Sequence, residues 1–252
     1  MSTITAPAAG AAAARRPAVR SRVRSRFYVG LGAFMVAIMV VGFWPSYFAR
    51  ALDEPQWRIH AHGALMFSWV ALLLAQAFLV RANRRPLHRR LGRVSFVLVP
   101  LIVLSSLSVA HWRFNHPAND PFDTLAYFLY VQVALLAQFV VAWSLAMANR
   151  AQPLVHARYM LCTALAIVDP IVARIAYNTL GIDIPWLQAI TYGLVDAILL
   201  ALIAWERRHA SGSTAFERML ALFVATQVPT FFLWTTPAWR SFATWFAALP
   251  LP

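Results

Sequence analysis

Two histidines each begin an apolar segment of this chain and lie among arginines. His88 lies in the stretch RRPLHRRLGR, and His156 lies in PLVHARYM. The positive end of a helix dipole and the neighbouring arginines disfavour protonation, so each imidazole is expected to stay neutral. A neutral imidazole is the form that ligates a metal. The pattern therefore predicts that His88 and His156 bind b-type haem iron or another transition metal.

Three arginines accompany these histidines and could orient haem propionates: Arg89, Arg90 and Arg158. A simpler interpretation stays open. Each histidine would then cap a helix end or contact a lipid phosphate, without any cofactor.

Three further histidines lie near the opposite ends of apolar runs and form a candidate outer metal site. His60 and His62 occur as HAH, and His111 follows a later run. Imidazole is a suitable ligand for several transition metals. Side chains two residues apart on a helix point about 200° apart, so His60 and His62 can share a site only if the start of the helix is unwound. The alternative is that all three are interfacial residues.

Two acids and one arginine fall inside apolar runs, where charge is costly and is a functional candidate by default. They are Asp169, Arg174 and Asp196. Two interpretations compete for this predicted cluster. It joins helices through hydrogen bonds, or it relays protons or binds a polar ligand.

The composition is that of a membrane protein. The 252 residues are 61% hydrophobic and 12% charged, whereas soluble domains carry about a quarter charged residues. The net charge of +13 is concentrated at the ends of apolar runs, which excludes a nucleic-acid-binding domain. The chain has no lysine, which excludes a retinal Schiff base, and no catalytic motif that would assign an enzyme activity.

Residues 1–26 are expected to form a disordered basic cytoplasmic tail, and residues 27–252 a single seven-helix transmembrane domain. The predicted all-α fold has seven apolar stretches near the length of about 20 residues that a spanning helix needs. They are 27–48, 58–80, 88–110, 123–147, 155–179, 186–205 and 215–235. The pattern STAFE predicts a capping box at Thr214 and Glu217 before the last of them.

Arginine distribution predicts the orientation. With a cytoplasmic N-terminus, inner segments hold seventeen arginines and outer segments four. We therefore expect a multi-pass protein of the bacterial inner membrane with its N-terminus inside.

A weak repeat relates the second and third predicted helices to the fourth and fifth. Each pair contains LLAQ, an Asn-Arg turn, then Pro-Leu and a His-x-Arg. Gln76 and His88 correspond to Gln138 and His156. A duplicated hairpin of this kind would place both histidines at a similar depth on the cytoplasmic side.

Several segments resemble a widespread family of uncharacterised bacterial seven-helix inner-membrane proteins. The resemblance lies in HAHGALMFSWVALLLAQAFLV, LHRRLGR, HARYMLCTALAIVDPIVAR and TPAWRSFATW. The His-Arg-x-x-Gly turn at residues 88–92 is also similar to a related membrane domain of unknown function. The resemblance implies the seven-helix fold and no activity.

Three functional hypotheses follow. The first is an integral membrane protein that binds b-type haem or a metal through its helix-end histidines, for electron transfer to a redox partner or for haem handling. The second is a proton-coupled transporter or channel that uses Asp169 and Asp196. The third is a non-catalytic assembly protein that binds a membrane complex.

Overall fold

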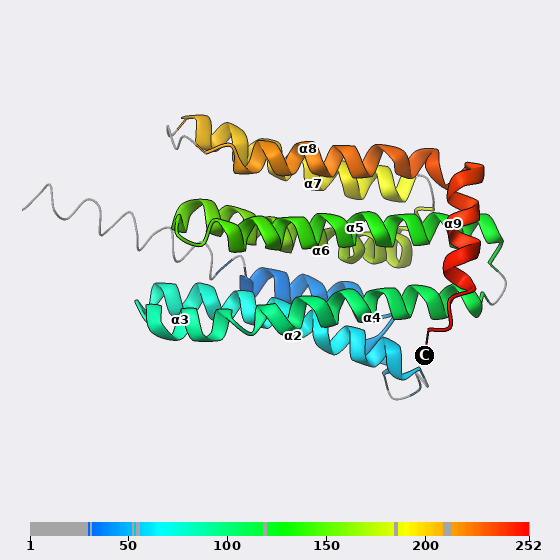
Figure 1. Cartoon of the computed structure of the whole chain (residues 1–252), viewed down its shortest axis with the longest axis horizontal. Helices are drawn as coiled ribbons and strands as arrows, with labels where there is room; N and C mark the ends of the chain where they lie inside the picture. The colour runs from blue at the N-terminus through cyan, green and yellow to red at the C-terminus, as the bar shows by residue number, and fades with distance from the viewer. Residues whose placement is uncertain are drawn as a thin grey trace, which may run out of the picture.

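The computed structural model describes residues 30, 32–51, 53, 56–117, 120–183, 186–208 and 213–251, and these residues are all-helical. The predicted tail, residues 1–26, lies outside the described residues. The first described helix is Gly32–Phe43. The others are η1 (Phe48–Arg50), α2 (Trp57–Arg81), α3 (Arg85–Gly92), α4 (Ser95–Asn115), α5 (Phe122–Ala148), α6 (Pro153–Leu180), α7 (Trp186–Arg208), α8 (Ala215–Gln227), η2 (Val228–Phe231), η3 (Leu233–Thr235) and α9 (Pro237–Ala247). The long helices run side by side along one axis (Figure 1).

Five helical segments are long and apolar enough to cross a membrane. They are α2, the combined segment Arg85–Asn115 formed by α3 and α4, α5, α6 and α7. The all-helical fold class is confirmed, and these five segments coincide with the second to sixth predicted spans. A multi-pass membrane protein is the architecture that they fit, because a helix satisfies its own backbone hydrogen bonds within lipid.

The first and last predicted spans are shorter than expected in the described residues. Gly32–Phe43 covers part of the predicted span 27–48, of which residues 27–29 and 31 lie outside the described residues. The seventh run changes from α8 to a 3-10 helix at Val228, directly before Pro229, whose ring has no N–H for a helical hydrogen bond. The seven-span topology and the orientation therefore stay predictions.

The predicted capping box before α8 is wrong. Thr214 makes no side-chain cap hydrogen bond. Glu217 instead lies 3.6 Å from Arg207 of α7, and the Ser213 hydroxyl accepts a hydrogen bond from the backbone N–H of Ala215. The Glu217 carboxylate, which was expected to contact the start of α8, thus lies beside the Arg207 guanidinium instead.

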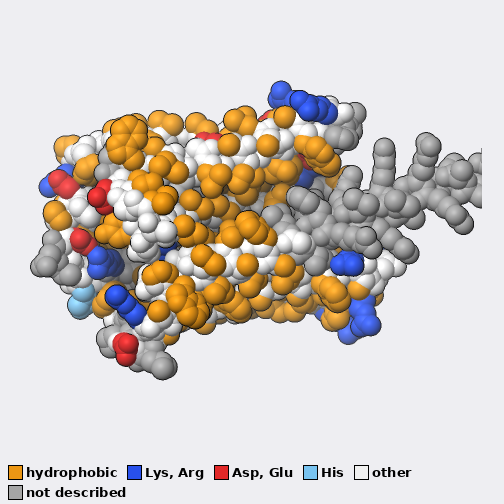
Figure 2. Space-filling view, turned by 180° about the vertical axis from the view of Figure 1, so that it is seen from behind, with side chains coloured by type: hydrophobic (Ala, Val, Ile, Leu, Met, Phe, Trp, Pro, Cys, Tyr) orange, Lys and Arg blue, Asp and Glu red, His pale blue; other side chains and the backbone are white. Residues whose placement is uncertain are grey.

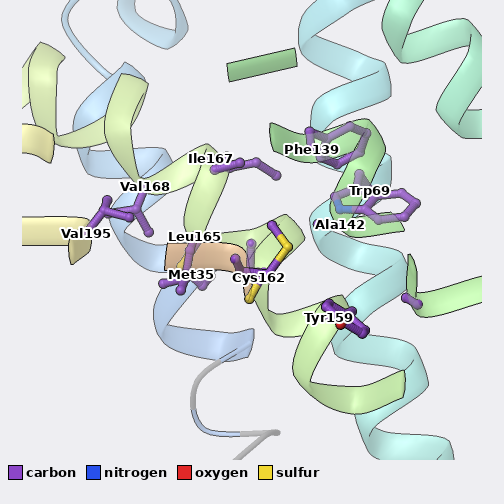
Figure 3. Packing of buried hydrophobic residues seen from close by; sticks show 14 of the residues in the cluster. Met35, Trp69, Phe139, Ala142, Tyr159, Cys162, Leu165, Ile167, Val168 and Val195 are labelled. Carbon is purple, nitrogen blue, oxygen red and sulfur yellow. The ribbon is translucent and has the colours of Figure 1, made fainter. Parts of the chain in front are cut away.

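The hydrophobic core is centred on α6 and α5. These two helices bury 61% and 56% of their apolar spans, against 22% for α2. Trp69 of α2 packs edge-on against Phe139 of α5 with ring centroids 5.0 Å apart, and Tyr159 and Cys162 of α6 lie beside them (Figure 3). Hydrophobic side chains cover the middle of the outer surface, while arginines gather toward its ends (Figure 2).

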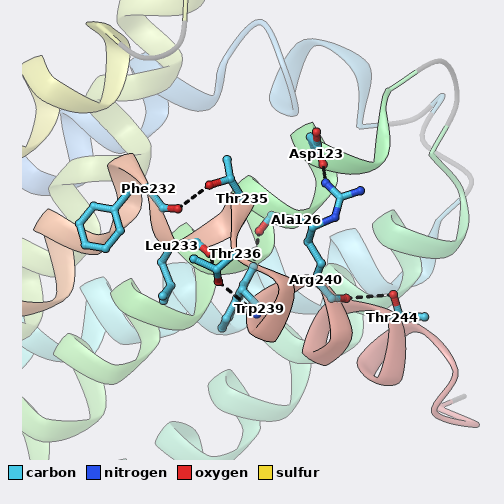
Figure 4. Close-up of polar contacts among 9 residues, drawn as sticks. All are labelled: Asp123, Ala126, Phe232, Leu233, Thr235, Thr236, Trp239, Arg240 and Thr244. Carbon is cyan, nitrogen blue, oxygen red and sulfur yellow. Dashed lines mark hydrogen bonds and ion pairs between the residues drawn. The ribbon is translucent and has the colours of Figure 1, made fainter.

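The short helix α9, which the sequence analysis did not predict, lies across one end of the bundle (Figure 1). Pro237 occupies its first turn, and the Thr236 hydroxyl accepts from the backbone N–H of Trp239. The Trp239 indole N–H donates to the Ala126 carbonyl of α5 at 2.9 Å, and Arg240 pairs with Asp123 (Figure 4). These contacts fasten α9 to the start of α5.

A close backbone approach between the first helix and α6 generates the first prediction. A Cβ at the buried Gly42 would lie 2.9 Å from both Cγ2 and the carbonyl oxygen of Ile171, whereas a Cβ at the exposed Gly193 of α7 would meet nothing within 4 Å. We expect Gly42→Ala to lower the free energy of unfolding by about 1–3 kcal/mol through overpacking. Gly193→Ala should leave it unchanged or raise it by up to about 1 kcal/mol.

Thermal unfolding of the purified protein in detergent, followed with a thiol-reactive dye, measures both effects. Cys162 is the single cysteine and is fully buried, so dye labelling reports unfolding. Equal unfolding temperatures for the two glycine variants would contradict the predicted contact.

Candidate functional site

The structure brings His88 and His156 together. His88 lies on α3 and His156 lies in the first turn of α6, 68 positions later in the chain. Their ring centroids are 6.4 Å apart and the ring planes are nearly perpendicular, at 87°. The two helix-end histidines thus share one place at the end of the bundle where α2 ends and α6 begins.

A hydrogen bond fixes the ring of His156. Its Nδ1 lies 2.8 Å from the carbonyl oxygen of Ala146, near the end of α5. A carbonyl only accepts, so Nδ1 carries the proton, and in the neutral ring the lone pair is then on Nε2. The sequence folds locally to allow this because Pro153 starts α6 directly after the short turn that follows α5.

His88 is held through its backbone rather than through its ring. The Gln76 side-chain N–H of α2 donates to the His88 carbonyl at 3.1 Å. A Cβ on Gly92 would lie only 3.2 Å from that same Gln76 nitrogen, so the glycine keeps room for this contact. The Nδ1 atom of the His88 ring is buried and has no hydrogen-bond partner among the described residues.

Two more polar side-chain atoms, on α2 and α5, are buried without a partner in the described part of the chain. They are Oε1 of Gln76 and Nε1 of Trp143, which lies three residues before Ala146 on α5. A buried polar group without a partner costs about 1–3 kcal/mol, so natural proteins seldom leave several together. Gln76 contacts the His88 backbone, so its unpartnered oxygen and the unpartnered Nδ1 of His88 mark this end of the bundle as a candidate ligand site.

The three predicted propionate-binding arginines lie in two different settings. Arg89 and Arg90 are exposed on α3. Arg158 is buried and forms an ion pair with Glu206 near the end of α7. Glu206 was not among the residues predicted from the sequence. The only signal for it was an acid near the end of α7, the end that meets the start of α6. Arg158 is thus already paired with an acid of the protein, unlike Arg89 and Arg90.

The structure does not bring the predicted outer metal ligands together. His60 Nδ1 lies 3.0 Å from the Tyr47 hydroxyl, and His62 Nδ1 lies 3.1 Å from the Ser105 hydroxyl. His111 Nε2 donates to the Ala247 carbonyl at 3.2 Å and so contacts α9. Among the described residues, no group of three or more His, Cys, Asp or Glu side chains could hold a metal ion. Each of these histidines instead joins two helical segments.

Asp169 forms a buried polar cluster with Gln188 and Thr191 of α7. These two partners were not predicted from the sequence. The Gln188 side-chain N–H and the Thr191 hydroxyl donate to Asp169 Oδ2 at 2.6 and 2.9 Å. The Tyr127 hydroxyl of α5 donates to Gln188 Oε1 at 3.4 Å. Gln188 and Thr191 are three residues apart, which places both on one face of α7.

The other two predicted intramembrane polar residues have different surroundings. Arg174 donates to the Pro170 carbonyl at 3.0 Å, and its guanidinium lies over the Phe43 ring at 4.3 Å. Asp196 Oδ1 is buried and has no hydrogen-bond partner within the described residues. Asp169, Arg174 and Asp196 therefore do not form one mutually hydrogen-bonded cluster.

Comparison with known proteins gives no match: no family model, no curated protein and no solved structure is similar to this chain. The resemblance to the uncharacterised seven-helix family stays a prediction. Function must therefore be argued from the residues themselves.

The buried ion pair generates the second prediction. Arg158→Met leaves Glu206 charged and unpaired in a buried site, which should lower the free energy of unfolding by about 3–5 kcal/mol. The double variant Arg158→Met/Glu206→Leu should recover most of that loss. As a matched control, Arg207→Met breaks the exposed pair with Glu217 and should cost no more than about 1 kcal/mol.

Thermal or denaturant unfolding of the four proteins in the same detergent tests this cycle. A loss of the same size in Arg158→Met and Arg207→Met would show that the Arg158–Glu206 contact contributes no more than a surface pair.

Proposed function

We propose that this protein is a multi-pass protein of the bacterial inner membrane that binds a metal centre, haem b iron or a transition-metal ion, between His88 and His156. The single observation that carries the proposal is the 6.4 Å separation of the two imidazole rings. Seven spans and a cytoplasmic N-terminus, as the arginine distribution favours, would place this site at the inner end of the bundle.

The distance between the rings supports shared ligation. Imidazole nitrogens bind metals at about 2.0–2.1 Å, so two imidazoles on opposite sides of one metal have centroids about 6 Å apart. The observed separation is 6.4 Å. The ring-to-ring distance of His88 and His156 is therefore of the size that two imidazoles on one metal would have.

The hydrogen bond of His156 also supports ligation. Metal-bound histidines almost always donate their second ring N–H to a carbonyl or a carboxylate, which fixes the ring and its tautomer. His156 donates Nδ1–H to the Ala146 carbonyl, which directs the Nε2 lone pair outward from that contact. The unpartnered Nδ1 of His88 and Oε1 of Gln76 give the site further capacity for polar contacts.

The donor set fits a metal that accepts two neutral nitrogen ligands. Imidazole suits Zn, Cu, Fe and Ni, and haem iron accepts an imidazole on its axial positions. Of the predicted propionate partners, Arg89 and Arg90 are exposed and carry no ion pair among the described residues. A haem iron or copper ion held there would supply one-electron chemistry. The protein would position it between the two imidazoles.

The third prediction tests this proposal with the full-length protein purified from haem-replete cells. We expect a Soret band, or a stoichiometric transition metal by elemental analysis. His88→Ala and His156→Ala should each reduce the bound metal centre by at least about tenfold, because even an outer-shell partner is worth 10–100-fold in affinity.

His116→Ala is the matched control. His116 lies beyond the end of α4, where its ring stacks on Trp112 at 5.2 Å, and its loss should leave the bound metal unchanged. A colourless preparation with no bound metal rejects the proposal and leaves the transporter and assembly roles. Equal losses in all three histidine variants would assign the effect to folding.

A second candidate function, a proton-coupled transporter or channel, is supported by the unpartnered Asp196 Oδ1 on α7. A carboxylate oxygen inside an apolar span that lacks a partner is a candidate for taking up a proton or a polar ligand. Asp169 lies on the neighbouring α6, but its two hydrogen bonds from α7 equally suit a structural joint between helices.

The fourth prediction separates these roles. A positioned acid or base typically contributes at least about a hundredfold to a proton-transfer rate. If the acids carry protons, Asp169→Asn and Asp196→Asn should therefore each lower proton flux into proteoliposomes by at least about tenfold, which is a conservative threshold. Asp123→Asn, an exposed acid paired with Arg240 on α9, should retain full flux. Undiminished flux in both intramembrane variants rejects this candidate.

A further inference from the structure

The helix α3 has two chemically different faces. Arg85, Arg89 and Arg93 recur every four residues and so form one stripe, and all three side chains are exposed. His88, Leu91 and Gly92 lie on the adjoining flank of the helix and are half-buried. The three arginine side chains are thus exposed, whereas His88 is half-buried beside His156.

The arginines of this stripe form no ion pair among the residues that the structure describes. From residue 55 to residue 119 the sequence contains no Asp or Glu. Consistent with this, the ion pairs of the described residues involve other arginines: Arg113, Arg158, Arg207 and Arg240. The two arginines that flank the stripe, Arg84 and Arg90, are also exposed. Five guanidinium groups within ten residues therefore require anions from outside the chain.

The surroundings of α3 identify the environment of those anions. Large hydrophobic side chains are exposed on α3 and on the adjacent ends of α2 and α4: Phe78, Val80, Leu87, Val94, Phe96 and Val97. Figure 2 shows arginine side chains beside hydrophobic surface at this end of the molecule. A cationic stripe bordered by apolar side chains is the pattern of a helix at the boundary between lipid headgroups and acyl chains.

We propose that the exposed arginine face of α3 is a binding surface for the phosphate headgroups of anionic phospholipids. A guanidinium group presents paired N–H donors that match phosphate oxygens, and a basic cluster beside a spanning helix attracts anionic lipid. The exposed Leu87 and Phe96 would contact the acyl chains of the same lipids. This proposal rests on the arginine face alone and does not require a metal at His88.

Native mass spectrometry of the intact protein tests the proposal. The protein is released from micelles that contain equal amounts of phosphatidylglycerol and phosphatidylcholine, and retained lipids are counted. We expect the wild type to retain phosphatidylglycerol preferentially. An arginine that contacts an anionic headgroup contributes about fivefold in binding, and we expect the clustered arginines of α3 to make these contacts, so Arg85→Gln/Arg89→Gln/Arg93→Gln should lower the preference by about a hundredfold.

A charge-matched control removes three other exposed arginines from the same end of the bundle, as Arg150→Gln/Arg208→Gln/Arg218→Gln. This control should keep the preference. Equal retention of both lipids by the wild type overturns the proposal, and so does an equal loss in the two triple variants. Displacement of phosphatidylglycerol by millimolar inorganic phosphate would also overturn it, because the site would then recognise free phosphate. If the α3 triple variant does not fold, Arg89→Gln alone should lower the preference about fivefold.

Discussion

Polar groups within the apolar helices must find their partners inside the protein, because lipid offers none. The helix α6 meets this constraint at two levels. Arg158 pairs with Glu206 near one end of α7, and Asp169 accepts hydrogen bonds from Gln188 and Thr191 near the other. The two contacts are separated by eleven residues of α6, about 16 Å along a helix. They fix both the rotation and the axial position of α6 against α7, and α6 in turn carries His156.

Sequence patterns predict the helices of this protein better than their contacts. A run of about twenty apolar residues has one common solution in lipid, so the five long segments lie where they were expected. The partners of Asp169 and Arg158 depend on how α7 is rotated, which a single sequence does not specify. The Gln188–Thr191 spacing and the acid Glu206 were the available signals. Helix α9 was missed because eleven residues are too few to span and its anchoring contacts involve residues over a hundred positions away.

The predicted repeat relates two hairpins whose contacts differ. Gln76 donates to the His88 carbonyl within its own hairpin, whereas the corresponding Gln138 donates to the Thr226 hydroxyl on α8 at 2.7 Å. His156 begins a helix of 28 residues, whereas His88 lies on a separate helix of eight. The duplication stays a prediction. It implied that His88 and His156 lie at a similar depth in the membrane, and a separation of 6.4 Å between their rings agrees with that.

The arginines and the imidazole of α3 depend on a single rotation of that helix. Asn83 turns the chain with a φ of +57°, a conformation that asparagine tolerates better than most residues, and α3 begins two residues later. At its other end the Ser95 hydroxyl donates to the Gly92 carbonyl at 2.7 Å, and the Gln76 amide nitrogen approaches closely enough that a Cβ at Gly92 would lie 3.2 Å from it. A shift of one residue would rotate α3 by about 100° and move the arginine stripe toward the site beside His156. Burial distinguishes the imidazole from the five arginines around it: the arginine side chains are exposed, and His88 is half-buried beside His156.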